Sequence, residues 1–406
     1  MTIDFFVLLG EKIFPILIAL APLVGAALLL WIGFKVRLHY KNAKDISKMK
    51  WVMLQIKIPK EIHKSPQAME LVINSFYQTF PGDWYKLYWV GMVRGWFSLE
   101  IVSIGGNVYF MMYIPAFFKN LIESQIYAQY PQAEINEVED YTKAFPEYKK
   151  DGTWEMWAAE FGLTQPDPYP IKTYIDYGLD KAVGSLEEFE RIDPITPMME
   201  FMGHIGPDEQ IWIQILVRAT MKEYHKPGTW RGTRKWKKYG EDLVKELKEK
   251  SRPKKEGEQP LPLTQGEKDK ISSIERSISK LGFDTGIRGI YLAKKGSFNA
   301  ANISGLIGSL RQYGSASLNG FAPTAATGFK FPWQDITGKR TETQKKLMLD
   351  AYKRRSFFYP PHKKTPSVLN SEELATIYHF PGQVSETPSF KRIEFKKSEP
   401  PANLPT

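Results

Sequence analysis

The feature that most constrains this chain is an uncharged apolar stretch near its start, residues 13–34, IFPILIALAPLVGAALLLWIGF. As an α-helix these 22 residues extend for about 33 Å, which is enough to cross a hydrocarbon core of about 30 Å. Pro15 and Pro22 would be costly in a soluble helix, but a membrane span tolerates proline. The stretch is apolar on every face, unlike the one-sided pattern of a soluble surface helix. The sequence therefore predicts a transmembrane helix.

The charges that flank this stretch predict its orientation. Asp4, Glu11 and Lys12 precede it, whereas the residues after it include Lys35, Arg37, Lys41, Lys44, Lys48 and Lys50. Because basic residues stay on the cytoplasmic side, we expect a single-pass protein of the cell membrane, with its N-terminus outside and its body in the cytoplasm. A cleaved signal peptide, which would place the body outside the cell, needs a basic start and a shorter apolar core.

Composition limits what the remaining part can be. A chain of 406 residues leaves room for two or three domains beyond the anchor, 1–50. The chain has no cysteine, which excludes disulfides and thiolate metal sites. Its net charge of +10 favours acidic partners such as lipid headgroups or nucleic acid.

The segment 51–150 is expected to form a first α+β module. Its expected elements are a strand at 51–58, a helix from Ser65-Pro66 to about Phe80, two strands around the turn Gly105-Gly106, a helix after Pro115 and a strand at 135–139. The order β-α-β-β-α-β is typical of the ferredoxin-like, or split βαβ, arrangement.

A second ferredoxin-like module is expected at 151–331. Its expected elements are strands at 171–177, 211–217, 287–294 and 321–331, and helices at 185–204, from Thr264, and at 297–313. Ser185 with Glu188 and Thr264 with Glu267 predict capping boxes. An insertion at 222–262 interrupts this module. The last part, 332–406, is expected to be a helix at 341–355 followed by an extended proline-rich tail.

Motifs for catalysis and cofactors are missing from the sequence. It contains no GxxxxGK[ST], GxSxG, HExxH or GxGxxG string. The histidines, at positions 39, 63, 204, 225, 362 and 379, lack metal-ligand spacing. We therefore expect a protein that is not an enzyme and has no cofactor or metal.

The insertion supplies the candidate binding residues. Its first part, HKPGTWRGTRKWKKYG, mixes basic and aromatic side chains, of which the candidates are Arg231, Arg234, Lys235, Trp236, Lys237 and Lys238. Such residues suit the phosphates and bases of nucleic acid or the anionic headgroups of lipid. The alternative is a solvated, mobile loop. The end of the insertion, EKSRPKKEGEQPLP, has the composition of a disordered linker.

Several long strings carry a resemblance to a known family. They are IPKEIHKSPQAMEL, WFSLEIVSIGG, NLIESQIYAQYPQAEINEVEDY, PYPIKTYIDYG, NSEELATIYHFPG and PPANLP. With them the chain resembles an uncharacterised bacterial family whose members form the membrane-anchored front part of conjugation and type IV secretion motor ATPases, or stand alone beside them. In fused members a PPxNLP-like stretch leads into a phosphate-loop ATPase domain, whereas this sequence ends at Thr406. That leaves a separate subunit or a chain cut short.

The resemblance implies a role but no catalytic residue. We expect a non-enzymatic, membrane-anchored scaffold or adaptor of a DNA-transfer or secretion apparatus, which docks a P-loop ATPase in trans at the cytoplasmic face. The alternative is a membrane-tethered nucleic-acid-binding protein. An enzyme of another chemistry has no motif in its favour.

Overall fold

The computed structural model describes residues 2–59, 64–78, 82–145, 147–180, 193–249, 263–329 and 331–382. The chain divides into two compact units. Unit 1 consists of Met1–Met49 and Phe80–Arg94, and unit 2 of Lys50–Thr79 and Gly95–Thr406.

Unit 1 contains the apolar helix that the sequence predicts. Helix α1 (Thr2–Lys48) includes Pro15 and Pro22 without interruption. It is long and apolar enough to be a membrane span or a signal anchor. Its apolar side chains are exposed, and Leu30, for example, keeps 76% of its surface. The unit also contains a π-helical turn, η1 (Tyr85–Val90).

Unit 2 is built on an antiparallel sheet. Within the described part of the chain, nine strands form it in the order β10-β5-β9-β6-β2-β3-β1-β4, and β11 also pairs with β9. The strands are β1 (Trp51–Lys57), β2 (Phe97–Ile104), β3 (Asn107–Pro115), β4 (Glu134–Val138), β5 (Trp154–Leu163), β6 (Glu209–Ala219), β9 (Gly282–Lys294), β10 (Phe321–Ala326) and β11 (Ser367–Asn370). The coarse prediction of an α+β fold is confirmed.

Local turn chemistry explains the hairpin of β2 and β3. Gly105 and Gly106 have φ of 56° and 81°. A two-residue type I′ hairpin turn requires such positive φ angles at both of its central residues. A Cβ on Gly106 would also lie 2.8 Å from the carbonyl oxygen of Gly203. The predicted hairpin is confirmed, and glycine is required at its turn.

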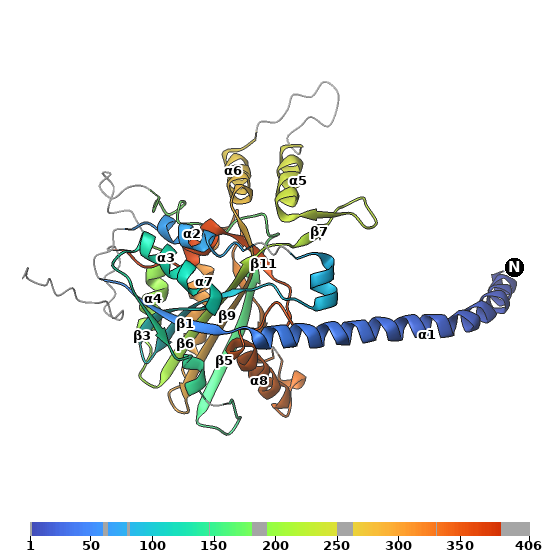
Figure 1. The fold of residues 1–406 in the computed structure, drawn as a ribbon, viewed down its shortest axis with the longest axis horizontal. Coiled ribbons are helices and arrows are strands. Elements are labelled where there is room, and N and C mark those ends of the chain that lie inside the picture. The colour runs from blue at the N-terminus through green and yellow to red at the C-terminus, as the bar shows by residue number, and fades with distance from the viewer. Residues whose placement is uncertain are drawn as a thin grey trace, which may run out of the picture. The chain divides into compact units, whose positions relative to one another are not determined.

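Helices cover both faces of the sheet (Figure 1). The larger apolar core lies on the face covered by α2 (Gln67–Asn74), α3 (Lys119–Gln129), α4 (Ile195–Gly203), α7 (Ala301–Arg311) and α9 (Ser371–Ile377). The core of the opposite face includes Leu349 and Tyr352 of α8 (Lys339–Lys353). Alternate strand residues therefore face two different cores.

One predicted strand is wrong, and one real strand was not predicted. Residues 171–177 form turns, although apolar and polar residues alternate there. None of their described amide hydrogen bonds goes to a strand. Ile171 N–H donates to Glu373 Oε1 (2.8 Å), Tyr174 N–H to Thr376 Oγ1 (3.0 Å) and Lys172 N–H to the carbonyl oxygen of Tyr313 (2.9 Å). The first strand of the second half is β5, whose alternation is weak because side chains on both of its faces are buried.

Other expectations are met only partly. Helix α2 ends at Asn74, before the predicted end near Phe80, which lies outside the described residues. The expected helix at 185–204 is present as α4 from Ile195, whereas its proposed cap, Ser185 and Glu188, also lies outside them. The predicted capping box of Thr264 and Glu267 is confirmed at the start of α6 (Gln265–Ser279).

The C-terminal part contradicts the prediction of an extended tail. Its helix is present as α8, but residues 367–382 then fold as β11, α9 and a buried end rather than as a tail. Every residue of α9 is buried. Hydrophobic residues such as Leu374, Ile377 and Tyr378 fill the larger core, which explains why this segment cannot remain outside it. The rest of the predicted tail, 383–406, lies outside the described residues.

Candidate functional site

The basic insertion is folded along most of its length, contrary to the reading of a solvated loop. Residues 223–249 form a hairpin, β7 (Glu223–His225) and β8 (Thr233–Lys235), followed directly by helix α5 (Trp236–Glu249). Helix α5 packs on α6, and the pair projects beyond the sheet (Figure 1). The predicted linker at its end, 250–262, lies outside the described residues.

The α5–α6 pair depends on close packing. Trp236 and Val244 of α5 are buried against Ile271, Ile274 and Ile278 of α6. Gly240 of α5 lies directly against α6, because a Cβ there would overlap a methyl group of Ile278. A small residue at this position therefore lets the two helices touch.

Three of the six candidate residues have contacts within the fold. Trp236 is only 4% exposed, so its ring cannot stack on a base, and that part of the prediction is wrong. Arg234 donates to Asp242 Oδ2 (2.8 Å) and its guanidinium lies 4.3 Å from the centroid of the Tyr239 ring. Lys238 donates to Glu241 (3.1 Å), and this hydrogen bond raises the pKa of Lys238.

The other three candidates are exposed on the hairpin and the first turn of α5. They are Arg231, Lys235 and Lys237. The Arg231 guanidinium lies 4.6 Å from the ring centroid of Trp230, which is 87% exposed at the hairpin tip. These residues present three cations and a flat aromatic ring to solvent, a combination that suits an anionic partner.

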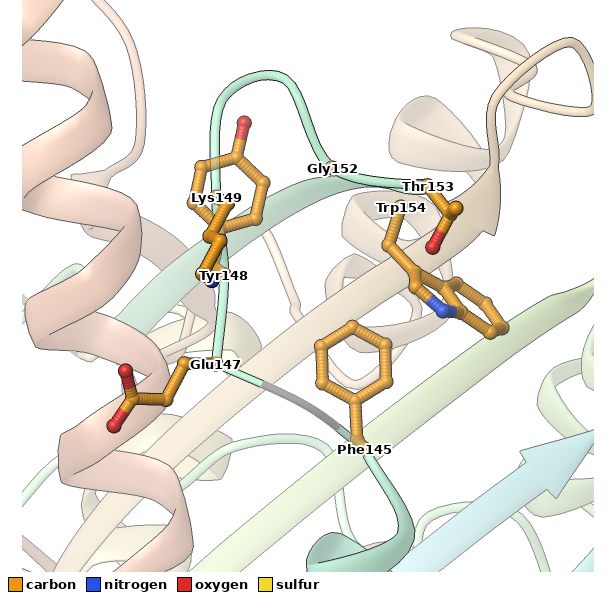
Figure 2. Close-up of a pocket in the computed structure, with 7 residues that line it drawn as sticks. All are labelled: Phe145, Glu147, Tyr148, Lys149, Gly152, Thr153 and Trp154. Atoms are coloured by element: carbon orange, nitrogen blue, oxygen red, sulfur yellow. The ribbon is translucent and has the colours of Figure 1, made fainter.

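The structure adds a pocket that the sequence did not indicate. It measures about 400 Å³ and lies where β5 begins, with a lining of Phe145, Glu147, Tyr148, Lys149, Gly152, Thr153 and Trp154. Figure 2 shows the rings of Phe145 and Trp154 next to each other and the Glu147 carboxylate pointing away from them. The two ring centroids are 5.0 Å apart.

Helix α8 supplies positive charge beside this pocket. Lys345 Nζ lies 3.3 Å from the Tyr148 hydroxyl, and Lys353 Nζ donates to the carbonyl oxygen of Phe145 (2.7 Å). Burial lowers the pKa of Lys353, although nearby carboxylates, first Glu147, oppose the shift. The pocket thus offers an aromatic wall near lysines, a site suited to a small apolar or aromatic group with an acidic substituent.

A row of polar side chains crosses the α8-covered face of the sheet. Glu160, Arg288, Gln214 and Glu100 stand opposite one another on β5, β9, β6 and β2. Arg288 donates to Glu160 (3.2 Å), and Gln214 donates to Glu100 (3.1 Å). All four are buried. Because these groups are buried and paired, their first role is to join the strands to the segment that covers them.

Arg355, directly after α8, provides that connection. It donates to Glu100 Oε1 (3.0 Å) and Oε2 (3.2 Å), and to both carboxylate oxygens of Asp140. Burial alone would raise the pKa of Asp140, but hydrogen bonds and charge from Arg355 outweigh it and hold this pKa below its usual value. The C-terminal segment is therefore held on the sheet by an ion cluster of one arginine and two carboxylates.

A second group of buried charges surrounds α9. Glu70 of α2 accepts from Ser371 (3.0 Å) and Lys280 (2.8 Å). Glu372 is 3.2 Å from Arg276 Nε. Burial raises the pKa of Glu372, against the opposing effects of Thr173 and these cations.

Glu373 is the most enclosed carboxyl of this group. Its oxygens accept the amides of Asn370 (2.8 Å) and Ile171 (2.8 Å). Burial raises its pKa to about 8 despite these hydrogen bonds. A perturbed carboxyl suggests acid–base chemistry only where a substrate can reach it, and Glu373 is fully buried.

Metal binding finds no support in the part of the chain that the structure describes. No three histidine, aspartate or glutamate side chains there are placed to hold an ion.

A family model described as "Domain of unknown function (DUF8128)" matches residues 36–392. The chain belongs to this family. The DUF8128 match begins just after the apolar stretch of α1 and includes the sheet, the α5–α6 pair and the C-terminal segment. No curated protein matches the chain. The description of DUF8128 names no process, so the resemblance to secretion ATPases stays a prediction.

Proposed function

We propose that this chain is a non-enzymatic, membrane-anchored scaffold that docks a P-loop motor ATPase at the cytoplasmic face of a conjugation or type IV secretion-like apparatus. The observation that carries the anchor is α1, whose exposed apolar side chains need a nonaqueous environment. The choice of partner rests on the resemblance of the sequence strings.

We also propose that the body consists of two ferredoxin-like modules joined edge to edge. The strand orders β4-β1-β3-β2 and β10-β5-β9-β6 support it, since each places the fourth strand beside the first and the third beside the second. The antiparallel pair β2 and β6 would then join the two modules. The pair α5–α6 would be an insertion between the second and third strands of the second module.

Co-purification tests the scaffold role. The full chain, solubilised from its native membrane with mild detergent, should bring a P-loop ATPase with it. A Trp154→Ser variant serves as a second bait. Loss of the ATPase from this variant alone would indicate that the aromatic pocket is the docking surface. Recovery of the full chain with no ATPase, from cells that contain the apparatus, would contradict the proposal.

Cysteine labelling tests the orientation, since the chain has no cysteine of its own. A cysteine in place of Ser272, an exposed residue of α6, should react with an impermeant maleimide only after lysis. A cysteine in place of Thr2 should react in intact cells. The reverse pattern would place the body outside and exclude a cytoplasmic ATPase as its partner.

The exposed Trp230–Arg231 pair favours a second candidate function, binding of nucleic acid. Phosphate contacts weaken steeply with salt. Titration of the purified chain with single-stranded DNA at rising salt should therefore show a falling affinity if the hairpin binds the backbone. Affinity that is absent even at low salt would exclude this candidate.

A further inference from the structure

Unit 1 exposes a dense group of aromatic residues. Trp84, Tyr85, Tyr88 and Trp89 are each more than half exposed, and η1 contains no buried residue. Soluble proteins rarely leave a contiguous apolar patch open to water. A patch of this kind therefore points to a partner that covers it.

Contacts within unit 1 place this segment along α1. Arg37 donates from Nη2 to the Trp89 carbonyl oxygen (3.0 Å), and its guanidinium lies 4.5 Å from the centroid of a Trp89 ring. Further along the chain, the Val93 amide donates to Asp45 Oδ2 (2.8 Å). The segment thus runs beside α1 in the direction that leads away from the apolar stretch.

Gly91 fixes the middle of this contact. Its φ is 77°, and a Cβ there would overlap the side chain of Lys41. Arg37, Lys41 and Asp45 follow one another at intervals of four residues and so lie on one face of α1. The aromatic segment therefore has a defined height along the helix.

That height coincides with a membrane surface. The apolar stretch ends at Phe34, so Arg37 lies about 4.5 Å and Asp45 about 16 Å further along the helix axis. The headgroup region on each side of a bilayer is about 5–8 Å thick. Trp89 therefore falls within the headgroup region, and Val93 falls in the water beyond it.

We propose that residues 84–90 are a second membrane contact, an aromatic segment that lies in the lipid headgroup region beside α1. The inference rests on the proposed membrane anchor. Tryptophan and tyrosine favour this zone because their rings combine an apolar body with a polar group. Lys86 can extend its ammonium group to the phosphates. The contact would set the depth of α1 and its rotation about its own axis.

Spin labels in the full chain test this placement. Single cysteines replace Tyr88, Leu30 of the apolar stretch and the exposed Ser272, and the chain is reconstituted in vesicles of phosphatidylethanolamine and phosphatidylglycerol. Collision of each label with oxygen, which enters lipid, is compared with collision with a nickel chelate, which stays in water. The oxygen-to-nickel ratio at Tyr88 should lie between the high value at Leu30 and the low value at Ser272.

Each other result has a separate meaning. A ratio at Tyr88 equal to that at Ser272, with Leu30 in lipid, overturns this inference and leaves the anchor intact. A water-like ratio at Leu30 overturns the anchor as well. A Tyr88 label shielded from both reagents indicates a protein partner and also overturns the inference.

Substitution of the rings supplies an independent check. Changing both Trp84 and Trp89 to serine should shift the Tyr88 label toward water. The matched control is Trp230→Ser, which removes an even more exposed ring from unit 2 and should leave the label unchanged. An unchanged ratio in the double variant contradicts the proposal.

Discussion

Replacement of Arg355 by methionine should destabilise unit 2 strongly. The arginine side chain is fully buried, stacks 4.3 Å from the centroid of the Tyr113 ring and bonds to two carboxylates, Glu100 and Asp140. Methionine keeps most of the volume but none of the charge. Both carboxylates would then be left without their main cation.

The size of the effect follows from that environment. Loss of one partner from a buried ion pair costs about 3–5 kcal/mol, because the remaining charge stays desolvated. Since two carboxylates depend on Arg355, we expect the upper end, about 5 kcal/mol. In a domain of this size each kcal/mol changes Tm by about 2–4 °C, so Tm should fall by about 10–20 °C.

Thermal unfolding followed by circular dichroism measures this change in the purified full chain. Arg354→Met is the matched control, because Arg354 is exposed and pairs on the surface with Asp350. It should cost less than about 1 kcal/mol. Adding Glu100→Gln and Asp140→Asn to Arg355→Met should recover much of the loss, since no buried charge remains unpaired.

Two results would refute this reasoning. One is an Arg355→Met protein as stable as the Arg354→Met control. The other is a triple variant less stable than Arg355→Met alone.

Acid should have a related effect on the wild type. The pKa of Asp140 is lowered in the folded state, so its contribution is present above the unfolded value near ~3.9 and is lost as the pH falls through the folded value.

Three further predictions concern other parts of unit 2. Replacing the exposed residues Arg231, Lys235 and Lys237 by glutamate should weaken binding to DNA or anionic vesicles at least about tenfold, which corresponds to a loss of about 1.4 kcal/mol of binding free energy, without a change in Tm. Equal binding of the variant and the wild type in an anisotropy titration would show that the hairpin is only a solvated surface. Gly240→Val should push α5 away from α6 and lower the free energy of unfolding by about 1–3 kcal/mol. Amide exchange should become faster in both helices, and unchanged exchange there would contradict the packing. Because the pKa of Glu373 is raised to about 8 in the folded state, the free energy of unfolding should fall as the pH rises from about 4.3 to about 8. Urea unfolding at both ends of this range should show a smaller fall in this free energy for Glu373→Gln than for the wild type. An equal fall in the two proteins would assign the pH dependence to another group.

Elements that depend on neighbouring residues could be predicted from the sequence. The turn of Gly105-Gly106 requires two residues with positive φ. The capping box of Thr264 and Glu267 requires two side chains three positions apart. In both cases the residues that decide the structure lie within three positions of each other in the chain, so the sequence alone predicts the structure.

Elements that depend on distant partners could not be predicted. The alternation at 171–177 resembles a strand, but the amides of Ile171 and Tyr174 donate to Glu373 and Thr376, about two hundred residues later. The segment predicted as a tail is buried in the core by partners that are distant in the chain. Ser371, for example, donates a hydrogen bond to Glu70, which lies 301 positions earlier. In the candidate site, the aromatic ring of Trp236 among basic residues predicts stacking on a base, whereas its position at the start of α5 buries it against α6.

The late position of Arg355 has a consequence for synthesis. Translation proceeds at about 5–20 residues per second, and 307 residues separate Lys48 from Arg355 (355 − 48), so the arginine follows α1 from the ribosome by about 15–60 s. Until Arg355 has been added, Glu100 and Asp140 have no cation from the C-terminal segment. A chain interrupted before residue 355 would thus lack both the cation of Glu100 and Asp140 and the buried helix α9 that fills part of the larger core.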